Sequence, residues 1–252
     1  MKKIFLSLAI IIILFVPQIH AQDFTIAAAA DLRYALTEVV AKYRETDSTI
    51  KINVVFGSSG NLFQQITQQA PYDVFFSADN SYPKKLEDQK LTVGKSTLYA
   101  IGHLVLWSSS KDVSKGLDIL KSEDVKKISL ANPEVAPYGK RAVEALKYYK
   151  LNEAVKDKIV KGDNVSQAAQ FCLTGNADCG LIALSLAISP EMATKGKYYT
   201  IDTKSYSPLE QSYVILKNAE KNKNVTKFVE FLASQKARAI FTKFGFKLPS
   251  EK

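Results

Sequence analysis

Strand-like and helix-like segments alternate along this chain of 252 residues, and this alternation limits its possible folds more than any other feature. Short apolar runs predict buried strands, and runs with apolar residues three or four positions apart predict amphipathic helices. This order favours an α/β fold with mainly parallel sheets flanked by helices. In the first part of the chain the expected strands are 24–29, 52–56 and 72–76, and the expected helices are 32–43, 62–69 and 82–88.

A second series of the same kind occupies the middle of the chain. Two strand-like runs, 98–107 and 211–216, flank it, and one or two helices over 225–244 end the chain. We therefore predict two lobes and a chain that crosses between them twice. Lobe one would hold residues 22–100 and 208–252, and lobe two would hold 101–207. Within lobe two the expected strands are 128–131 and 179–184, and the expected helices are 140–149 and 166–173.

The first residues predict export. Lys2 and Lys3 precede an apolar run over 4–16, and Ile19-His20-Ala21 supplies the small residue of a cleavage site. This is the pattern of a secretory signal peptide over residues 1–21, cleaved after Ala21. An uncleaved membrane anchor is the alternative, but the apolar run is shorter than the roughly 20 residues that a spanning helix needs. We expect a periplasmic protein that is soluble after cleavage.

The charge pattern does not indicate a nucleic-acid partner. The formal net charge is +9, and removal of Lys2 and Lys3 with the predicted signal peptide would leave +7. The remaining lysines are spread along the chain, whereas nucleic-acid-binding proteins concentrate basic residues on one motif or face. We interpret the lysines as a solvated surface. A diffuse positive field of this kind can still help to collect a small anion.

Few residues could carry covalent or metal chemistry. Cys172 and Cys179 could form a disulfide across the turn at 174–176, and two buried free thiols are the alternative. The only histidines are His20, within the predicted signal peptide, and His103, so neither a zinc site nor a serine with a histidine base is indicated. We therefore expect no catalytic residue, no bound metal cation and no cofactor, although an exported hydrolase is the rival class.

Four junctions that open helices share a neutral, small-residue character. They lie at 27–32, 57–61, 132–139 and 162–166, two in each predicted lobe. The first amides of a helix have no intrahelical acceptor, and the helix dipole makes that end positive. The turn Gly57-Ser58-Ser59-Gly60-Asn61 can therefore be an ordinary helix cap or part of a cradle for an anion. A cleft between the lobes would bring amides from both sides to one small anion.

Five motifs, in the same order, resemble the periplasmic molybdate/tungstate-binding proteins of ABC importers. They are Ala28-Ala29-Ala30-Asp31-Leu32, Phe56-Gly57-Ser58-Ser59-Gly60-Asn61-Leu62, Asp73-Val74-Phe75-Phe76-Ser77-Ala78-Asp79, Asn132-Pro133-Glu134-Val135-Ala136-Pro137-Tyr138-Gly139 and Lys243-Phe244-Gly245-Phe246. The resemblance implies the type II periplasmic-binding-protein fold, with an oxyanion held between the lobes by neutral hydroxyls and backbone amides. By position it points to Ser59, to Tyr138 and to the backbone of Val165, and it adds Ala30, Asp31 and Ser58 to the wall of the site.

The function that the resemblance implies is capture of molybdate or tungstate by a monomer and delivery to an ABC permease in the cytoplasmic membrane. Molybdenum or tungsten would enter only as the oxyanion. Two alternatives stay open. The protein could bind another oxyanion, such as phosphate, arsenate or sulfate, or it could be a ligand-sensing partner of a membrane receptor, which would share the fold and the site.

Two positions depart from the family pattern. Many relatives have Ser, Thr or Asn where this chain has Asp31, and some carry a tyrosine ligand where it has Ala183; Tyr138 could supply that hydroxyl. A carboxylate about 4 Å from a dianion would cost several kcal/mol at an effective dielectric constant near 20. Asp31 could cap its own helix through the amide of Arg33 or Tyr34. It could instead bind a protonated ligand or be protonated itself, or it could pair with Arg33 or another cation.

Overall fold

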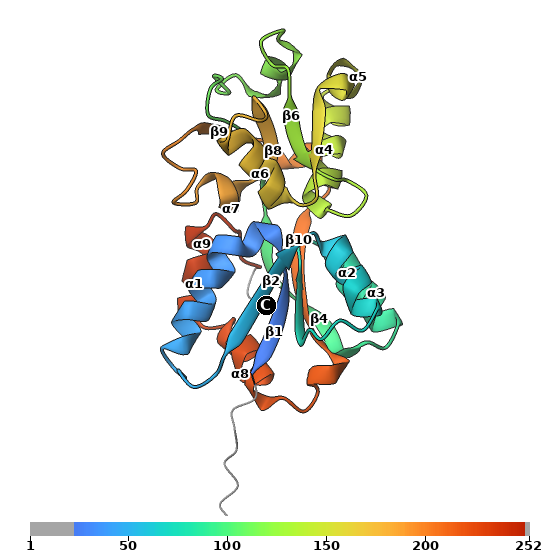
Figure 1. Ribbon diagram of the computed structural model, residues 1–252, viewed down its shortest axis with the longest axis vertical. Coiled ribbons are helices and arrows are strands. Elements are labelled where there is room, and N and C mark those ends of the chain that lie inside the picture. The colour runs from blue at the N-terminus through green and yellow to red at the C-terminus, as the bar shows by residue number, and fades with distance from the viewer. Residues whose placement is uncertain (1–22, 250–252) are drawn as a thin grey trace, which may run out of the picture.

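The computed structural model describes residues 23–249, and these form two lobes that each contain a five-stranded sheet (Figure 1). The predicted signal peptide, 1–21, lies outside the described residues. The sheet of lobe one has the order β2-β1-β3-β10-β4, and the sheet of lobe two has the order β7-β6-β8-β5-β9. The strands are β1 (Phe24–Ala29), β2 (Ile52–Gly57), β3 (Val74–Ser77), β4 (Thr92–Gly102), β5 (Leu104–Ser108), β6 (Ile128–Ala131), β7 (Ile159–Gly162), β8 (Cys179–Ala183), β9 (Lys197–Thr200) and β10 (Leu209–Leu216).

Helices connect most of these strands. The α-helices are α1 (Arg33–Arg44), α2 (Ser59–Thr67), α3 (Ser81–Asp88), α4 (Pro137–Tyr148), α5 (Asn152–Val155), α6 (Val165–Leu173), α7 (Leu184–Ala187), α8 (Lys223–Phe231) and α9 (Gln235–Lys243). The 3-10 turns are η1 (Ala30–Leu32), η2 (Gly116–Lys121), η3 (Lys156–Lys158), η4 (Thr203–Ser205) and η5 (Lys217–Ala219).

Each sheet is mixed. In lobe one β1 pairs in parallel with β2 and β3, and β10 pairs antiparallel with β3 and β4. Lobe two repeats this plan, with β6 parallel to β7 and β8, and β5 antiparallel to β8 and β9. The predicted two-lobed α/β fold is confirmed. The expectation of mainly parallel pairing is only half met, because β10 in lobe one and β5 in lobe two, which adjoin the crossings, each pair antiparallel with both neighbours.

The sheet of lobe one is covered on both faces, which explains why its central strands are apolar throughout. Phe24, Ile26 and Ala28 of β1 pack on one side with buried residues of α1, α8 and α9. Ala27 of β1 faces the other side, where it joins Leu62 of α2 in a smaller core that includes α3. Figure 1 shows α1 and α9 on one side of this sheet and α2 and α3 on the other.

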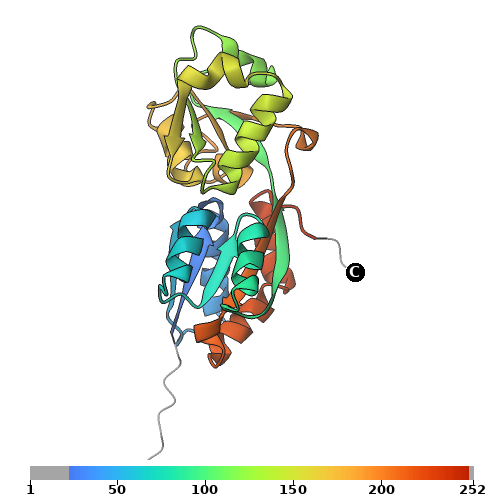
Figure 2. The same cartoon turned by 90° about the vertical axis from the view of Figure 1, so that its right-hand side faces the viewer.

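The strand-like run 98–107 is not one strand. It divides at His103 into the end of β4 in lobe one and β5 in lobe two, so it carries the first crossing (Figure 2). The second crossing runs from β9 to β10, over residues 201–208. Near the first crossing, the segment that follows α9 lies beside the end of β4, where Lys247 and Ile101 exchange backbone hydrogen bonds of 2.7 and 3.0 Å. We propose that the lobes divide at these crossings, close to the predicted limits of 100/101 and 207/208.

Three helices begin earlier than predicted. The structure starts α2 at Ser59, α4 at Pro137 and α6 at Val165, so the polar junction residues belong to the first turns. The strands β7 and β9 were not predicted; each has only four residues, β7 is mostly half-buried and β9 is mostly exposed, so neither shows a clear apolar pattern. Among residues 23–249, no helix is long and apolar enough to cross a membrane.

Candidate functional site

Four helix starts meet between the lobes. The strands β1 and β2 of lobe one and β6 and β7 of lobe two run in parallel pairs, and each leads at its carboxyl end into η1, α2, α4 or α6. The amides that open these helices face the same region, where ligands bind in open α/β sheets. The two lobes thus present positive helix ends to one shared space.

That space is a small cavity with about 190 Å³ of empty volume, its opening to solvent included. All six residues singled out from the sequence line it: Ala30, Asp31, Ser58, Ser59, Tyr138 and Val165. The other lining residues are Ala29, Gly57, Ala78, Ala136, Pro137 and Asn164. None of these twelve is a lysine, arginine or histidine. So small a space suits a small ion and not a drug-sized ligand.

The two serines of the Gly57–Asn61 turn have different surroundings. Ser58 is the N-cap of α2, and its Oγ accepts a hydrogen bond from the Asn61 amide at 3.4 Å. Ser59 is fully buried, and its Oγ accepts a hydrogen bond from the Ala78 amide at 3.0 Å. No acceptor for the Ser59 hydroxyl hydrogen is found within residues 23–249, so this hydroxyl can donate into the cavity. The capping and cradle interpretations of the turn are therefore compatible, because different serines serve them.

Asp31 does not cap its own helix, so that expectation is wrong. No side-chain cap is made at η1 or α1, because Oδ2 instead accepts a hydrogen bond from Nε2 of Gln211 at 2.5 Å. Its Oδ1 is buried and has no hydrogen-bond partner among the described residues. Burial raises the pKa of this carboxyl from 3.8 to about 6, and hydrogen bonds from Gln211 and Tyr138 offset only part of that rise.

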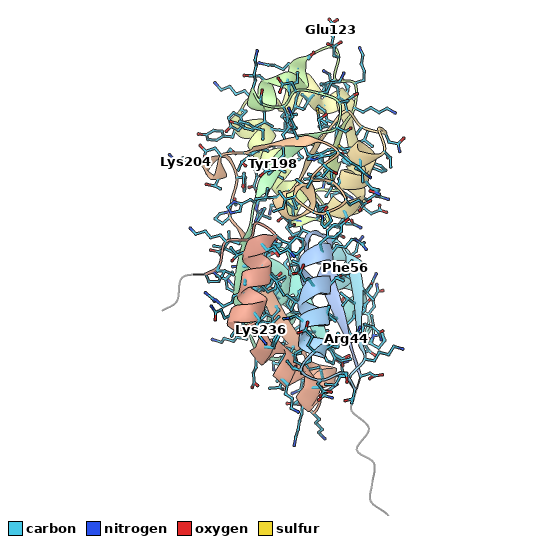
Figure 3. The ribbon with its side chains drawn as sticks, turned by 90° about the vertical axis from the view of Figure 1, so that its left-hand side faces the viewer. Arg44, Phe56, Glu123, Tyr198, Lys204 and Lys236 are labelled. Atoms are coloured by element: carbon cyan, nitrogen blue, oxygen red, sulfur yellow. The ribbon has the colours of Figure 1, made fainter. Side chains whose placement is uncertain are left out.

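Asp31 does not pair with a cation either. Arg33, the nearest cation in sequence, lies with its guanidinium 5.0 Å from the centre of the Phe56 ring. Figure 3 labels Phe56 on the first lobe, near its boundary with the second. A guanidinium over an aromatic face is a common surface arrangement, and here it directs the charge away from the carboxyl. Protonation of the ligand or of Asp31 itself is the remaining possibility from the sequence.

Gln211 is the site residue that sequence reasoning missed. It lies in β10 and is fully buried. Its Oε1 accepts a hydrogen bond from the Tyr99 hydroxyl at 2.8 Å, while its Nε2 donates to Asp31. The signal was a glutamine at the start of the strand-like run 211–216, since a polar side chain that is buried in a strand needs a partner. The partner, 180 residues away, could not be read from the sequence.

Tyr138 brings a hydroxyl from lobe two to the side chains of Asp31 and Gln211. It lies in the first turn of α4, is 1% exposed, and its hydroxyl is 3.4 Å from Nε2 of Gln211. Burial, with the nearby Asp31 carboxyl, holds its pKa well above the ordinary value, so the phenol is neutral. A Cβ atom on Gly102 would lie 2.2 Å from this hydroxyl, so only glycine leaves room for Tyr138 at the end of β4. Val165 is the first residue of α6, where Asn164 accepts a hydrogen bond from the Gln167 amide as N-cap.

The lobes are closed around the cavity. Ser166 Oγ donates to the Ala30 carbonyl at 2.8 Å, and Ser185 Oγ donates to the Asp31 carbonyl at 2.7 Å. The amide of Gly60 donates to the carbonyl of Val135 at 2.8 Å. Tyr34 and Glu191 add a side-chain hydrogen bond at the rim. A larger hollow beside them is lined in part by the exposed residues Arg33 and Glu191, so we take the cavity with the mostly buried lining as the site.

The predicted disulfide is wrong. Cys172 and Cys179 are both free and buried. Cys172 Sγ lies 3.1 Å from Ser129 Oγ and packs over Gly180, where an added Cβ would be 2.5 Å from the sulfur. Neighbouring residues of a strand point to opposite faces. Cys179 therefore faces the other side of the sheet from Cys172, and burial raises the pKa of its thiol to about 11.

Other candidate groups lie apart from the cavity. His103 is half-buried at the first crossing, where burial and Lys247 lower its pKa. Asp79 Oδ1 accepts from the amide and hydroxyl of Ser81 at the start of α3, and Asp73 Oδ2 accepts from the Thr25 amide at 2.7 Å. Within the described residues there is no group of three or more His, Cys, Asp or Glu side chains that could hold a metal ion. The arrangement therefore suits binding of an anion by neutral donors.

Comparisons with known proteins find relatives over nearly the whole chain. A family model described as bacterial extracellular solute-binding protein matches residues 24–247. The chain is 36% identical over 231 residues to the molybdate-binding protein ModA of Azotobacter vinelandii, with 91% of each chain covered. It is 34% identical over 228 residues to ModA of Rhodobacter capsulatus, with 90% of this chain and 88% of the relative covered.

Solved structures show the same likeness. The periplasmic molybdate-binding protein of Azotobacter vinelandii matches with a TM-score of 0.85 and 30% identity, and the match covers 90% of this chain and 100% of that one. The sulfate-binding protein SubI of Mycobacterium tuberculosis matches with a TM-score of 0.73, covering 90% of this chain and 86% of that one. Its identity of 14% supports only a shared fold.

Proposed function

Because this chain belongs to the family of bacterial extracellular solute-binding proteins, we propose that it captures molybdate between its lobes and delivers it to an ABC permease. Tungstate, which has the same shape and charge, is proposed as a second ligand. We further propose that the chain is exported by the signal peptide of residues 1–21, is cleaved after Ala21 and works as a periplasmic monomer. No covalent step is needed, because capture and release follow from closing and opening of the lobes.

One observation carries this proposal: four helix starts from two lobes surround a single small cavity whose lining contains no cation. An anion buried there would be held by backbone amides and by the hydroxyls of Ser59 and Tyr138. Val165 would contribute through its backbone, and Ala30, Asp31 and Ser58 would complete the wall. Helix dipoles favour a negative charge at this point. Because the donors suit any tetrahedral oxyanion, discrimination against the smaller sulfate would rest on the size of the closed cavity.

A second candidate has its own support. The unpartnered Oδ1 of Asp31 could accept a hydrogen bond from an oxyanion that carries a proton. Hydrogen phosphate and hydrogen arsenate are such ions, whereas molybdate at neutral pH carries no proton. If Asp31 is ionised in the complex, the site would therefore prefer these ions.

A panel of melting temperatures separates the two candidates. A ligand that binds only the folded protein at 100 times its Kd stabilises it by about 2.7 kcal/mol. For a protein of this size that corresponds to about 5–10 °C. We expect such shifts with micromolar molybdate and tungstate, a weaker shift with sulfate and none with phosphate. A shift with phosphate or arsenate and none with molybdate would contradict the proposed ligand.

A further inference from the structure

The Asp31 carboxyl has one oxygen in use and one free. Oδ2 accepts from Gln211 Nε2 at 2.5 Å, and Oδ1 has no partner among the described residues although Asp31 is only 1% exposed. The Tyr99 hydroxyl donates to Oε1 of Gln211 at 2.8 Å, which turns the amide so that its nitrogen faces Asp31. The pair therefore holds Oδ2 as an acceptor and leaves Oδ1 on the wall of the cavity.

An ionised Asp31 would repel any anion in this cavity, and no cation among the described residues pairs with it to offset the repulsion. The groups that face it are neutral: Tyr99 from β4, Tyr138 from α4 and Gln211 from β10. Ser185 of α7 donates to the backbone carbonyl of Asp31. On its own side Arg33 is turned to Phe56. Because the carboxyl is enclosed and tied to Gln211, it cannot move away into solvent.

We propose that Asp31 carries a proton in the complex and donates it from Oδ1 to an oxygen of the bound anion, so that capture takes up one proton from solvent. This inference rests on the proposed function. A buffer acid or hydronium ion in solvent gives up the proton, which forms an O–H bond on the carboxyl, and no other bond is made or broken. The position that repels an anion when charged then becomes a neutral donor, like Ser59 and Tyr138. Ions that bring their own proton would lose this advantage, because two donors would face each other.

The free protein is prepared for this step. Burial already raises the pKa of Asp31 to about 6, and an anion beside the carboxyl would raise this pKa much further, because a like charge disfavours the ionised form. Because molybdate binding and protonation of Asp31 are linked, the Kd for molybdate depends on pH. Below the pKa of the free carboxyl the Kd for molybdate should be constant. Above it the Kd should rise about tenfold for each pH unit, because protonation must accompany binding.

Isothermal titration calorimetry with molybdate, in two buffers of different ionisation enthalpy, measures the protons taken up. Between about pH 7.5 and about pH 8.5 we expect about one proton for each molybdate bound by the wild type. In Asp31→Asn the side-chain amide can present an N–H where the protonated carboxyl presents its O–H. This variant should bind with about zero proton uptake and with a Kd that does not change with pH.

Asp73→Asn is the matched control. Asp73 also has a raised pKa, but it accepts from the Thr25 amide and lies outside the cavity lining. Its variant should take up as many protons as the wild type. If the wild type binds molybdate without proton uptake, the inference about Asp31 is overturned and the proposed function stands. Loss of binding in Asp31→Asn at every pH would also overturn it, because an ionised carboxylate would then be required. If neither the wild type nor Asp31→Asn binds molybdate at any pH, the proposed function fails and this inference with it.

Discussion

Ser59 is the hydroxyl whose contribution to binding can be separated most cleanly from its contribution to folding. Its Oγ accepts from the Ala78 amide, and its hydrogen is free to donate into the cavity. A hydrogen bond to a charged group contributes about 1.5–3 kcal/mol. Ser59→Ala should therefore raise the Kd for molybdate about 10- to 100-fold, measured by calorimetry. Loss of the Ala78 contact should lower the melting temperature by only about 2–4 °C.

Ser129→Ala is the control for this variant. Ser129 is also fully buried and donates to the Ala168 carbonyl at 2.7 Å, but it lies within lobe two, outside the cavity lining. We expect a similar loss of stability and an unchanged Kd. An unchanged Kd in Ser59→Ala would remove Ser59 from the site.

The raised pKa of Asp31 predicts a stability change with a definite sign. The folded state holds this proton up to about pH 6, whereas the unfolded chain releases it near 3.8. The folded state therefore binds more protons between these values, and its free energy of unfolding falls as pH rises through this window. In ligand-free protein, Asp31→Asn should match the wild type near about pH 4. It should be more stable by up to about 3 kcal/mol at about pH 7.5.

Urea unfolding of the two ligand-free proteins at both pH values gives this difference directly. An equal difference in unfolding free energy at about pH 4 and about pH 7.5 would mean that the carboxyl is not destabilised by burial, and the expected gain would be refuted.

Single residues were predicted from the sequence only where their role is local. Ser58 and Ser59 follow a strand and open a helix, so their place could be inferred from neighbouring residues. The environment of Asp31 could not, because it depends on Gln211, 180 residues away. The disulfide prediction failed for a related reason. A separation of seven residues allows a bond, but only the strand around Gly180 decides that Cys172 and Cys179 face opposite sides of the sheet.

At the scale of elements, apolar periodicity found the strands and helices with extensive buried surface. It missed β7, which has four residues and only Gly162 buried, because the pattern depends on burial. It also placed the starts of α2, α4 and α6 too late. The first turn of α2, for example, is Ser59-Gly60-Asn61, which has no apolar residue to begin a periodic pattern.

Gly60 of α2 lies at a contact between the lobes that leaves no room for a larger residue. A Cβ atom at this position would lie 2.7 Å from the Val135 carbonyl oxygen of lobe two and 2.7 Å from the Tyr82 hydroxyl. Overpacking of this kind costs about 1–3 kcal/mol. Since the clash with Val135 arises when the lobes close, Gly60→Ala should raise the Kd for molybdate about 10- to 100-fold. Without ligand the lobes can separate and relieve the clash with Val135, and the Tyr82 hydroxyl ends a flexible side chain that can shift, so the free energy of unfolding of the ligand-free protein should fall by less than this overpacking cost.

Gln64→Ala provides the comparison on the same helix, because Gln64 is exposed and should affect neither quantity. Calorimetry and urea unfolding of both variants are the measurements. A Gly60→Ala protein that binds as tightly as the wild type would show that the contact between Gly60 and Val135 is not needed for capture.

At the scale of the whole molecule, alternation of strands and helices predicted the α/β class, and the second such series between the strand-like runs 98–107 and 211–216 predicted the two-lobed arrangement. The pairing of β10 between β3 and β4 joins strands more than a hundred residues apart, so it could not be derived from local patterns. The closed state rests on a few hydrogen bonds between lobes, among them Ser166 to Ala30 and Gly60 to Val135. So small a set is compatible with an equilibrium that one bound anion can shift.

A crystal structure of the protein grown with molybdate, measured at an X-ray energy where molybdenum scatters anomalously, tests the central claim most directly. The account predicts a single anomalous peak in the cavity between Ser59, Tyr138 and the backbone of Val165, with the lobes closed around it. A peak elsewhere on the molecule, or an empty cavity at saturating molybdate, would contradict it.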